Sequence, residues 1–249
     1  MPVSAWMIER LAPAPGQRVL ELAAGPGDTG FLAAERVLPG GTLVCSDGSE
    51  SMLAVARARA AELGIDNVEF KRLELERIDL PAAEVDGVLC RWGYMLSADP
   101  AAALSETRRV LAPGGRLVLA VWDDSSGNPW ATIPRQALAG AGHGSSPDPG
   151  GPGMFALSAP GRLQELLHSA GFLDVVVEPL ELGRSYPSLD AYVAETLDLS
   201  LEFAEVFARL SDGERVQVER EIAALSQPFV RPDGSLELPG RSLVAAASA

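Results

Sequence analysis

The sequence predicts an α/β fold: a doubly wound, mainly parallel sheet of seven strands with helices on both faces and a small helical cap. Two observations predict it. Short apolar segments alternate along the chain with segments of helical periodicity, an order typical of parallel sheets that helices cover on both faces. A glycine-rich turn, Gly25-x-Gly27-x-x-Gly30, follows the first apolar segment, and such turns let backbone approach a ligand closely.

Seven segments have the length and apolar content of buried strands, and turn-forming residues bound most of them. The turn sequence RPDGS precedes the last one. In chain order these segments cover residues 18–23, 41–47, 68–73, 85–90, 115–122, 173–182 and 241–248.

Helical patterns lie between these strands, and several of them carry residues that favour helix ends. The residues expected to cap helix N-termini are Asp28 or Thr29, Ser49, and Asp99, with Pro100 in the first turn. The glycines expected to end helices are Gly64 and Gly114. A further helix is expected within residues 158–172.

Two segments depart from the alternating pattern. Residues 123–157 are rich in Gly, Pro, Ser and Asp around one short helical stretch, and we expect residues 140–153 to be mobile. Residues 188–226 are expected to form two helices, the second opened by a capping box of Ser211 and Glu214. We therefore expect a single domain, residues 1–249, with these two insertions and a core of residues 18–122, 158–182 and 235–249.

The composition limits the partners and the location of the protein. A net charge of −14 argues against nucleic acid, which basic surfaces bind by neutralising phosphates. No stretch approaches the ~20 apolar residues of a membrane helix, and the N-terminus lacks the pattern of a signal peptide. Cys45 and Cys90 lie in apolar, strand-like segments. We therefore expect both to be buried free thiols of a protein in the reducing cytosol. We expect a cytoplasmic monomer or homodimer with no membrane partner.

The residues around the glycine turn bear on which ligand it holds. The glycine spacing fits a dinucleotide site, and Asp47 lies twenty residues past Gly27. Against a pyrophosphate, Glu21 ends the strand before the turn, and Asp28 places a negative charge at the helix start. A ligand with an ammonium group and a ribose suits better, because Glu21 attracts the cation and Asp47 accepts from both ribose hydroxyls. The dinucleotide alternative stays open.

Five segments, in this order and spacing, resemble class I S-adenosylmethionine-dependent methyltransferases. VLELAAGPGDTG resembles the first motif of that family, CSDGSESML its second-strand acidic motif, and RLELERIDLP its adenine segment. VDGVLCRWGYML and ALSETRRVLAPGGRLVLAVW are similar to its fourth-strand and fifth-strand segments. The resemblance covers residues 18–122, implies a Rossmann-like fold, and is nearest to the type 11 group, related to quinone-biosynthesis methyltransferases that act on small molecules.

The resemblance implies S-adenosylmethionine as cofactor and a set of residues that bind it. Asp47 would bind the ribose, Met52 would lie near the adenine face, and Glu74 with the Leu75 amide would meet the adenine edge. Glu74 stands where the family usually has Asp, so its carboxylate must reach from a longer arm. The implied cofactor-binding residues are Glu21, Gly25, Gly27, Asp47, Gly48, Met52, Glu74, Leu75 and Arg91, the last for the donor's carboxylate.

One feature departs from the family pattern. Seventeen residues precede the first predicted strand, whereas the type 11 group usually carries a longer N-terminal extension that helps to cover the active site. We therefore expect either a short lid or a true start that lies upstream.

The implied reaction is in-line transfer of a methyl group from a sulfonium, for which the enzyme mainly holds the acceptor in line and excludes water. A general base is needed only where the acceptor's proton is not easily lost. His143 is the candidate base, His168 is expected at the surface, and no Cys/His cluster has metal-ligand spacing.

Several residues near strand ends are candidates for acceptor binding. Trp92 and Tyr94 either wall the pocket or pack the sheet edge, and Trp122 and Trp130 are candidates to stack on a flat acceptor. Asp123 and Asp124 either orient the acceptor or are solvated.

Three functions compete on these observations. The leading one is transfer of a methyl group from S-adenosylmethionine to an O-, C- or N-nucleophile of a small-molecule acceptor. The alternatives are an NAD-dependent oxidoreductase and a non-catalytic binding protein on the same fold.

Overall fold

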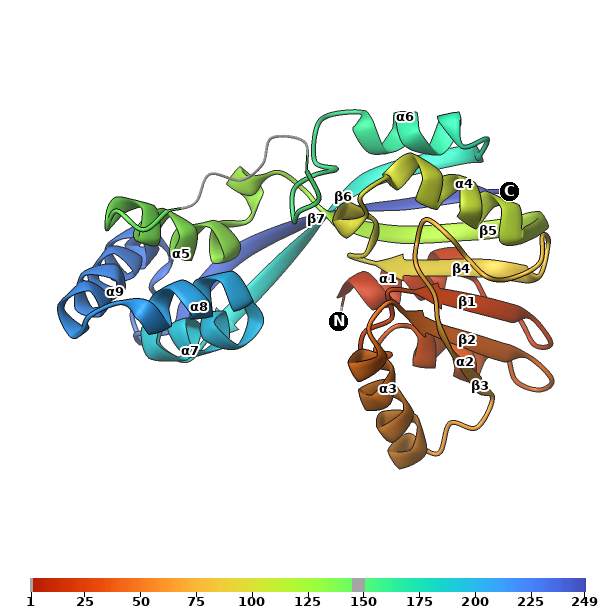
Figure 1. The fold of residues 1–249 in the computed structure, drawn as a ribbon, viewed down its shortest axis with the longest axis horizontal. Helices are drawn as coiled ribbons and strands as arrows, with labels where there is room; N and C mark the ends of the chain where they lie inside the picture. The colour runs from red at the N-terminus through yellow and green to blue at the C-terminus, as the bar shows by residue number, and fades with distance from the viewer. Residues whose placement is uncertain (1, 145–150) are drawn as a thin grey trace. The chain divides into compact units, whose positions relative to one another are not determined.

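A computed structural model describes residues 2–144 and 151–249 (Figure 1). The chain forms two compact units, which we call the sheet unit and the helical unit. The sheet unit takes in Met1–Trp122, Gly150–Leu180 and Ser242–Ala249, and the helical unit takes in Asp123–Pro149 and Glu181–Arg241. The helical unit contains most of both segments expected as insertions, and the single domain stays a prediction.

The sheet unit is built on the predicted seven-stranded sheet, in the order β3-β2-β1-β4-β5-β7-β6. Neighbouring strands among β1 to β5 pair in parallel, and β7 runs antiparallel to β5. The predicted fold class is confirmed, although β6 and β7 are longer than predicted because both continue into residues of the helical unit. The strands are β1 Arg18–Leu22, β2 Thr42–Asp47, β3 Val68–Arg72, β4 Val85–Arg91, β5 Leu111–Trp122, β6 Leu173–Tyr186 and β7 Leu236–Ser248.

The strand order reverses between β1 and β4. From β1 the chain adds β2 and β3 on one side, and it then returns to add β4 and β5 on the other. The register pairs Glu21 with Leu89 and Leu22 with Cys90, so both strands end at the same edge of the sheet. Open α/β sheets bind their ligands at this switch point, beyond the carboxyl ends of the strands.

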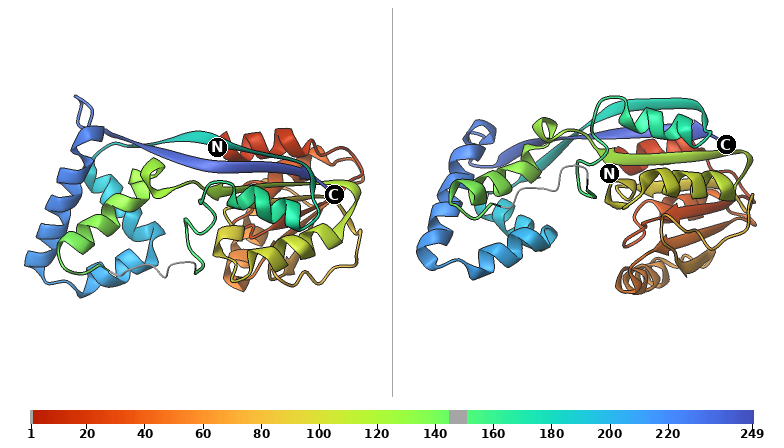
Figure 2. Two further views of the ribbon diagram at one scale, coloured as in Figure 1. Left: turned by 90° about the horizontal axis from the view of Figure 1, so that it is seen from above. Right: turned by 45° about the horizontal axis from the view of Figure 1, so that its top comes forward.

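Helices cover the sheet within this unit. α1 contacts β4 and β5, α2 contacts β1 and β2, α3 contacts β2 and β3, and α4 contacts β5 and α6. Figure 2 shows α1 on one side of the sheet and α4 with α6 on the other. These helices are α1 Pro2–Leu11, α2 Gly30–Arg36, α3 Glu50–Leu63, α4 Pro100–Val110 and α6 Arg162–Ser169.

Most of the predicted helix ends are confirmed. The Ser49 side chain accepts a hydrogen bond from the Met52 amide at the start of α3, and Gly64 ends that helix at a positive φ of 69°. Asp99 caps α4, with Pro100 in the first turn.

Three details of the sheet unit differ from prediction. Thr29 precedes α2 but makes no side-chain cap, because its hydroxyl pairs with that of Ser4. α4 ends at Val110 and not at Gly114, because Leu111 is already extended and pairs with Val85 of β4. Helix α1 was not predicted, although its buried residues recur at helical spacing: Val3, Met7, Ile8 and Leu11.

The helical unit groups α5 Pro129–Gly140 with α7 Leu189–Leu199, α8 Leu201–Arg209 and α9 Asp212–Ser226 (Figure 1). Residues 188–226 thus form three helices and not two, because the chain leaves helical geometry at Ser200, whose side chain then caps α8. The capping box of Ser211 and Glu214 is confirmed. The core of this unit includes Ile133, Tyr192, Phe203, Val218 and Ile222.

The described ranges contain neither a membrane-spanning helix nor a cluster of metal ligands. None of the helices there is long and apolar enough to cross a membrane. Among residues 2–144 and 151–249, no group of three or more His, Cys, Asp or Glu side chains is placed to hold a metal ion. Residues 145–150, part of the segment expected to be mobile, lie outside the described residues.

Candidate functional site

Two strained turns meet at the switch point. Ala23 follows β1 with φ 49°, and Trp92 follows β4 with φ 60°, a region that residues with a side chain rarely adopt. Gly93 lies between them, since a Cβ on Gly93 would come within 2.6 Å of the Ala23 Cβ and 2.7 Å of the Cys90 Sγ. Strained backbone of this kind clusters at ligand sites.

Glu21, at the end of β1, holds the glycine turn through a buried hydrogen bond. The side chain is only 2% exposed, and its Oε1 accepts a hydrogen bond from the Gly30 amide at 2.8 Å. Its Oε2 is buried and accepts no hydrogen bond among the described residues. Burial raises the pKa of Glu21 to about 8, against the opposing effects of the Gly30 hydrogen bond and Arg91. Glu21 therefore holds the turn from a buried position, and its predicted attraction for a cation stays a prediction.

Asp47 ties the end of β2 to the same turn. Its Oδ2 accepts from the Gly25 amide at 2.8 Å, and its Oδ1 accepts from the Ser49 amide at 2.9 Å. An ionised carboxylate offers about four lone-pair sites, so both oxygens retain capacity for ligand hydroxyls. The structure thus places Asp47 beside the glycine turn, where the ribose interaction was predicted.

The glycines of the turn have different reasons to be glycine. A Cβ on Gly27 would lie 2.4 Å from the Phe31 ring, and Gly27 also has a φ of +85°. A Cβ on Gly25, by contrast, would meet no atom within 4 Å. Internal packing therefore accounts for Gly27, whereas Gly25 borders open space, and contact of either residue with a ligand stays a prediction.

Asp28 does not act at the start of α2. Its Oδ1 accepts from Arg59 at 2.7 Å and its Oδ2 from Arg91 at 2.9 Å. Partial burial acts to raise the pKa of Asp28, but the two arginines outweigh it and lower that pKa. The negative charge that we expected to oppose a pyrophosphate is therefore compensated by two cations, which weakens that argument against a dinucleotide.

The predicted adenine side is assembled from β2, α3 and the chain after β3. A Cβ on Gly48 would lie 3.0 Å from the Glu74 Oε2. The carboxylate of the longer Glu74 side chain therefore lies beside Gly48. Arg72 links the two, with its Nε on the Gly48 carbonyl at 3.0 Å and its Nη2 at 3.8 Å from Glu74. Met52 is 45% exposed at the start of α3, and Leu75 lies beside Gly93.

Similarity to known proteins decides the family. Residues 13–138 match the family model described as "Methyltransferase domain". Nocamycin O-methyltransferase of Saccharothrix syringae is 31% identical over 211 residues, which cover 78% of this chain and 73% of that protein. The chain belongs to the methyltransferase domain family. This confirms the resemblance to class I S-adenosylmethionine-dependent methyltransferases.

Two further proteins show the extent of the likeness. A demethylmenaquinone methyltransferase of Thermus thermophilus is 40% identical over 103 residues, which are 41% of this chain and 46% of that protein. The chain thus spans less than half the length of that relative. The crystal structure of the YcgJ protein of Bacillus subtilis shares the fold, with a TM-score of 0.65 at 19% identity, covering 99% of this chain and 97% of that one.

Arg91, Trp92 and Trp122 form a row at the carboxyl ends of β4 and β5. The Arg91 side chain is 11% exposed, and its guanidinium lies 4.8 Å from the centre of the Trp92 ring. Trp92 stacks on Trp122 with centroids 4.4 Å apart, and its Nε1 donates to the Ser242 hydroxyl at 3.0 Å. Trp122 is 7% exposed, so the two indoles pack on each other. Their predicted contact with an acceptor is untested.

Tyr94 does not wall a pocket. It is fully buried in the sheet unit, and its hydroxyl pairs with that of Thr107 at 2.6 Å. Burial raises its pKa well above the ordinary value. Of the two alternatives predicted for Tyr94, lining a pocket is wrong and packing holds, because the short 3-10 helix Tyr94–Leu96 turns its ring into the core.

Two other candidates belong to the helical unit. The His143 Nε2 lies 3.3 Å from the Glu214 Oε1, and His143 lines a small pocket with Arg135, Phe203 and Val206. The Trp130 Nε1 donates to Asn128 at 3.2 Å, and the Arg184 guanidinium lies 4.1 Å from the centre of its ring. His168 is exposed on α6, as predicted.

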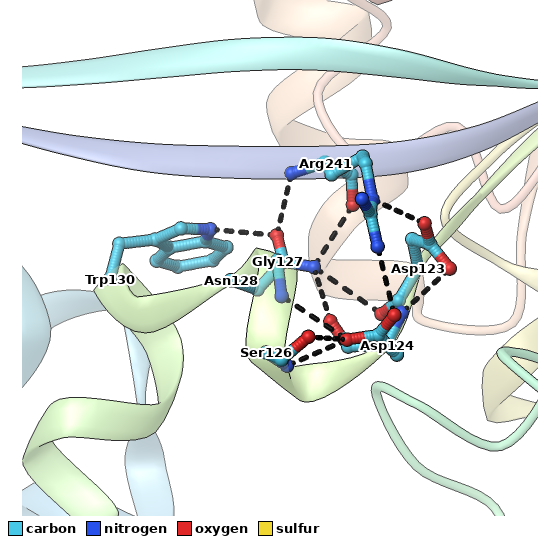
Figure 3. A network of polar contacts seen from close by, with 7 residues as sticks. All are labelled: Asp123, Asp124, Ser126, Gly127, Asn128, Trp130 and Arg241. Atoms are coloured by element: carbon cyan, nitrogen blue, oxygen red, sulfur yellow. Dashed lines mark hydrogen bonds and ion pairs between the residues drawn. The ribbon is translucent and has the colours of Figure 1, made fainter.

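Asp123 and Asp124 belong to one network of polar contacts, in which the Asp123 side chain is 12% exposed and the Asp124 side chain is 44% exposed (Figure 3). That they orient an acceptor stays a prediction. Both pair with Arg241, Asp123 at 2.5 Å and Asp124 at 2.8 Å. The buried Asn128 amide donates to the carbonyls of Asp123, Asp124 and Arg241, and its oxygen accepts from the Arg241 and Trp130 N–H groups. The sequence carried no signal for this network, because Asn128 and Arg241 lie 113 residues apart.

Proposed function

We propose that this protein transfers a methyl group from S-adenosylmethionine to a nucleophile of a small-molecule acceptor, as a monomer or a homodimer. One observation carries the proposal. At the carboxyl end of β2 the Asp47 carboxylate holds the Gly25 amide, beside a face of Gly25 that borders open space. Asp47 thus has the glycine turn on one side and Glu74 on the other. This arrangement suits a nucleoside that carries an amino-acid tail.

The residues present fit the donor. Asp47 and Gly48 would hold the ribose, Glu74, Leu75 and Met52 the adenine, and Gly25 the amino-acid backbone. The donor itself supplies an electrophilic methyl group on a sulfonium. The protein's share is to bind, to orient and to exclude water, for which the strained turns at Ala23 and Trp92 provide a rigid frame.

The donor's two charged ends have candidate partners in the turn. Arg91, held by Asp28, offers a positive charge for the donor's carboxylate. Burial raises the pKa of Glu21 to about 8, so its unpartnered Oε2 would have to lose a proton before it could offer a negative charge to the ammonium group. His143 remains the candidate base where the acceptor's proton must be removed. The acceptor is a small molecule, as the names of the relatives suggest.

A thermal-shift comparison tests the proposal. S-adenosylmethionine and S-adenosylhomocysteine should each raise the melting temperature in a concentration-dependent manner, because both bind the folded state, and NAD should not. A shift with NAD alone would overturn the assignment of S-adenosylmethionine as cofactor and favour the oxidoreductase alternative. Donor binding without methyl transfer to any acceptor in a mass-spectrometric screen would favour the non-catalytic alternative.

A further inference from the structure

Asp28, within the glycine motif, forms two ion pairs that the motif itself does not explain. Its two carboxylate oxygens accept from Arg59 on α3 and from Arg91 at the end of β4, at 2.7 and 2.9 Å. Arg59 also donates to the carbonyl of Pro26, at 2.9 Å, inside the same turn. A single side chain therefore joins the turn after β1 to a helix on one side and to a strand on the other.

The turn is held at three points, and Asp28 provides the one nearest its middle. Glu21 holds the amide of Gly30, and Asp47 holds the amide of Gly25. Gly27 has a φ of +85°, a conformation that the chain does not favour by itself in any residue but glycine. Without Asp28, the stretch between the two amides would lose its ion pair with Arg91 at the end of β4 and its ion pair with Arg59 of α3, and only the hydrogen bond from Arg59 to the Pro26 carbonyl would remain.

The same carboxylate also positions Arg91. The Arg91 side chain is 11% exposed and lies against Trp92, so its guanidinium has little freedom to move while Asp28 accepts from it. Loss of the Asp28 charge would leave a nearly buried cation without this partner, and such a group rearranges toward water or toward another anion.

We propose that Asp28 is a positioning residue for S-adenosylmethionine: its carboxylate fixes the glycine turn to α3 and β4 through Arg59 and Arg91, and thereby sets donor affinity. This inference rests on the proposed function. Asp28 acts through its two partners and needs no contact with the donor.

Calorimetric titration with S-adenosylhomocysteine tests the inference. Asp28→Asn keeps the size of the side chain and removes its charge, and it should raise the Kd by about tenfold or more at low salt, the scale of one lost charge-assisted hydrogen bond. Arg59→Gln should raise the Kd by a smaller factor. The double variant should raise it by less than the product of the two single factors, because both act through one ion pair.

The matched control is Glu50→Gln, which removes the exposed ion pair of Glu50 with Arg57, at 2.7 Å, on the same helix α3. It should leave the Kd within about twofold of wild type. A residue that only stabilises the fold would lower the melting temperature and leave the Kd of the folded protein unchanged. A Kd for Asp28→Asn within twofold of wild type, or single-variant factors that multiply, would overturn the inference. No binding to the wild-type protein would refute the proposed function itself and the inference with it.

Discussion

The Glu21 carboxylate and Gly30 are fitted to each other. Oε1 of Glu21 accepts the Gly30 amide at 2.8 Å, and a Cβ on Gly30 would lie only 2.1 Å from Oε2 of Glu21 and 3.0 Å from the Leu43 Cδ2. A strand residue and a helix residue nine positions apart thus share one small space under the glycine turn. The absence of a side chain at Gly30 makes room for the Glu21 carboxylate and not for a ligand.

Gly30→Ala should therefore destabilise the protein. The new methyl group would displace a buried carboxylate that accepts a hydrogen bond from the Gly30 amide, and we expect the free energy of unfolding to fall by about 1–3 kcal/mol. Urea denaturation measures it. Gly140→Ala is the control, because a Cβ there meets nothing within 4 Å and Gly140 lies in a helix, so it should be neutral or stabilising. Equal free energies of unfolding for Gly30→Ala and wild type would show that the Glu21 side chain can move aside without destabilising the protein.

Glu21 should make stability depend on pH near neutrality. Its pKa is raised from 4.5 to about 8 in the folded protein, so between these values the folded state holds a proton that the unfolded state has lost. Stability from this group therefore falls as the pH rises through that window, by at most about 1.4 kcal/mol per pH unit, and levels off above it.

Urea denaturation midpoints measured from about pH 5 to about pH 9 check this dependence. This range spans the pH values over which a carboxyl group with a raised pKa titrates. Glu21→Gln should flatten the slope, and Glu62→Gln, an exposed position on α3, should leave it as in wild type. The same slope in wild type and Glu21→Gln would mean that Glu21 is ionised throughout.

Asp47→Asn should weaken donor binding. The substitution removes the charge that holds the Gly25 amide and that would accept the ribose hydroxyls, a loss of about 1–3 kcal/mol in binding free energy. Calorimetric titration with S-adenosylhomocysteine measures it. Asp66→Asn, an exposed position before β3, is the matched control and should bind as wild type does. Unchanged affinity for Asp47→Asn would place the ribose elsewhere.

Tyr94→Phe should affect stability and not binding. It deletes the hydroxyl that pairs with Thr107 in the core, while Thr107 still donates to the Ala103 carbonyl. We expect a loss of about 1 kcal/mol in the free energy of unfolding and no change in donor Kd. A weakened Kd at unchanged stability would return Tyr94 to the binding site.

Local patterns along the chain were enough to predict the strands, most helix ends and the family. Alternating apolar segments, caps such as Ser49 and Asp99, and the spacing of Gly25, Gly27 and Asp47 are all readable along the chain. The carboxyl ends of parallel strands meet at one edge, so the position of Asp47 beside the glycine turn and that of Glu74 beside Gly48 also followed.

The tertiary structure alone decided which partners the charged and aromatic side chains take. Asp28 pairs with Arg59 and Arg91, Trp92 stacks on Trp122, and Tyr94 turns into the core. Asn128 joins chain segments 113 residues apart. These choices rest on hydrogen bonds and packing between residues distant in sequence. Local periodicity holds no information about them, because their energies exist only once the chain has brought the groups together.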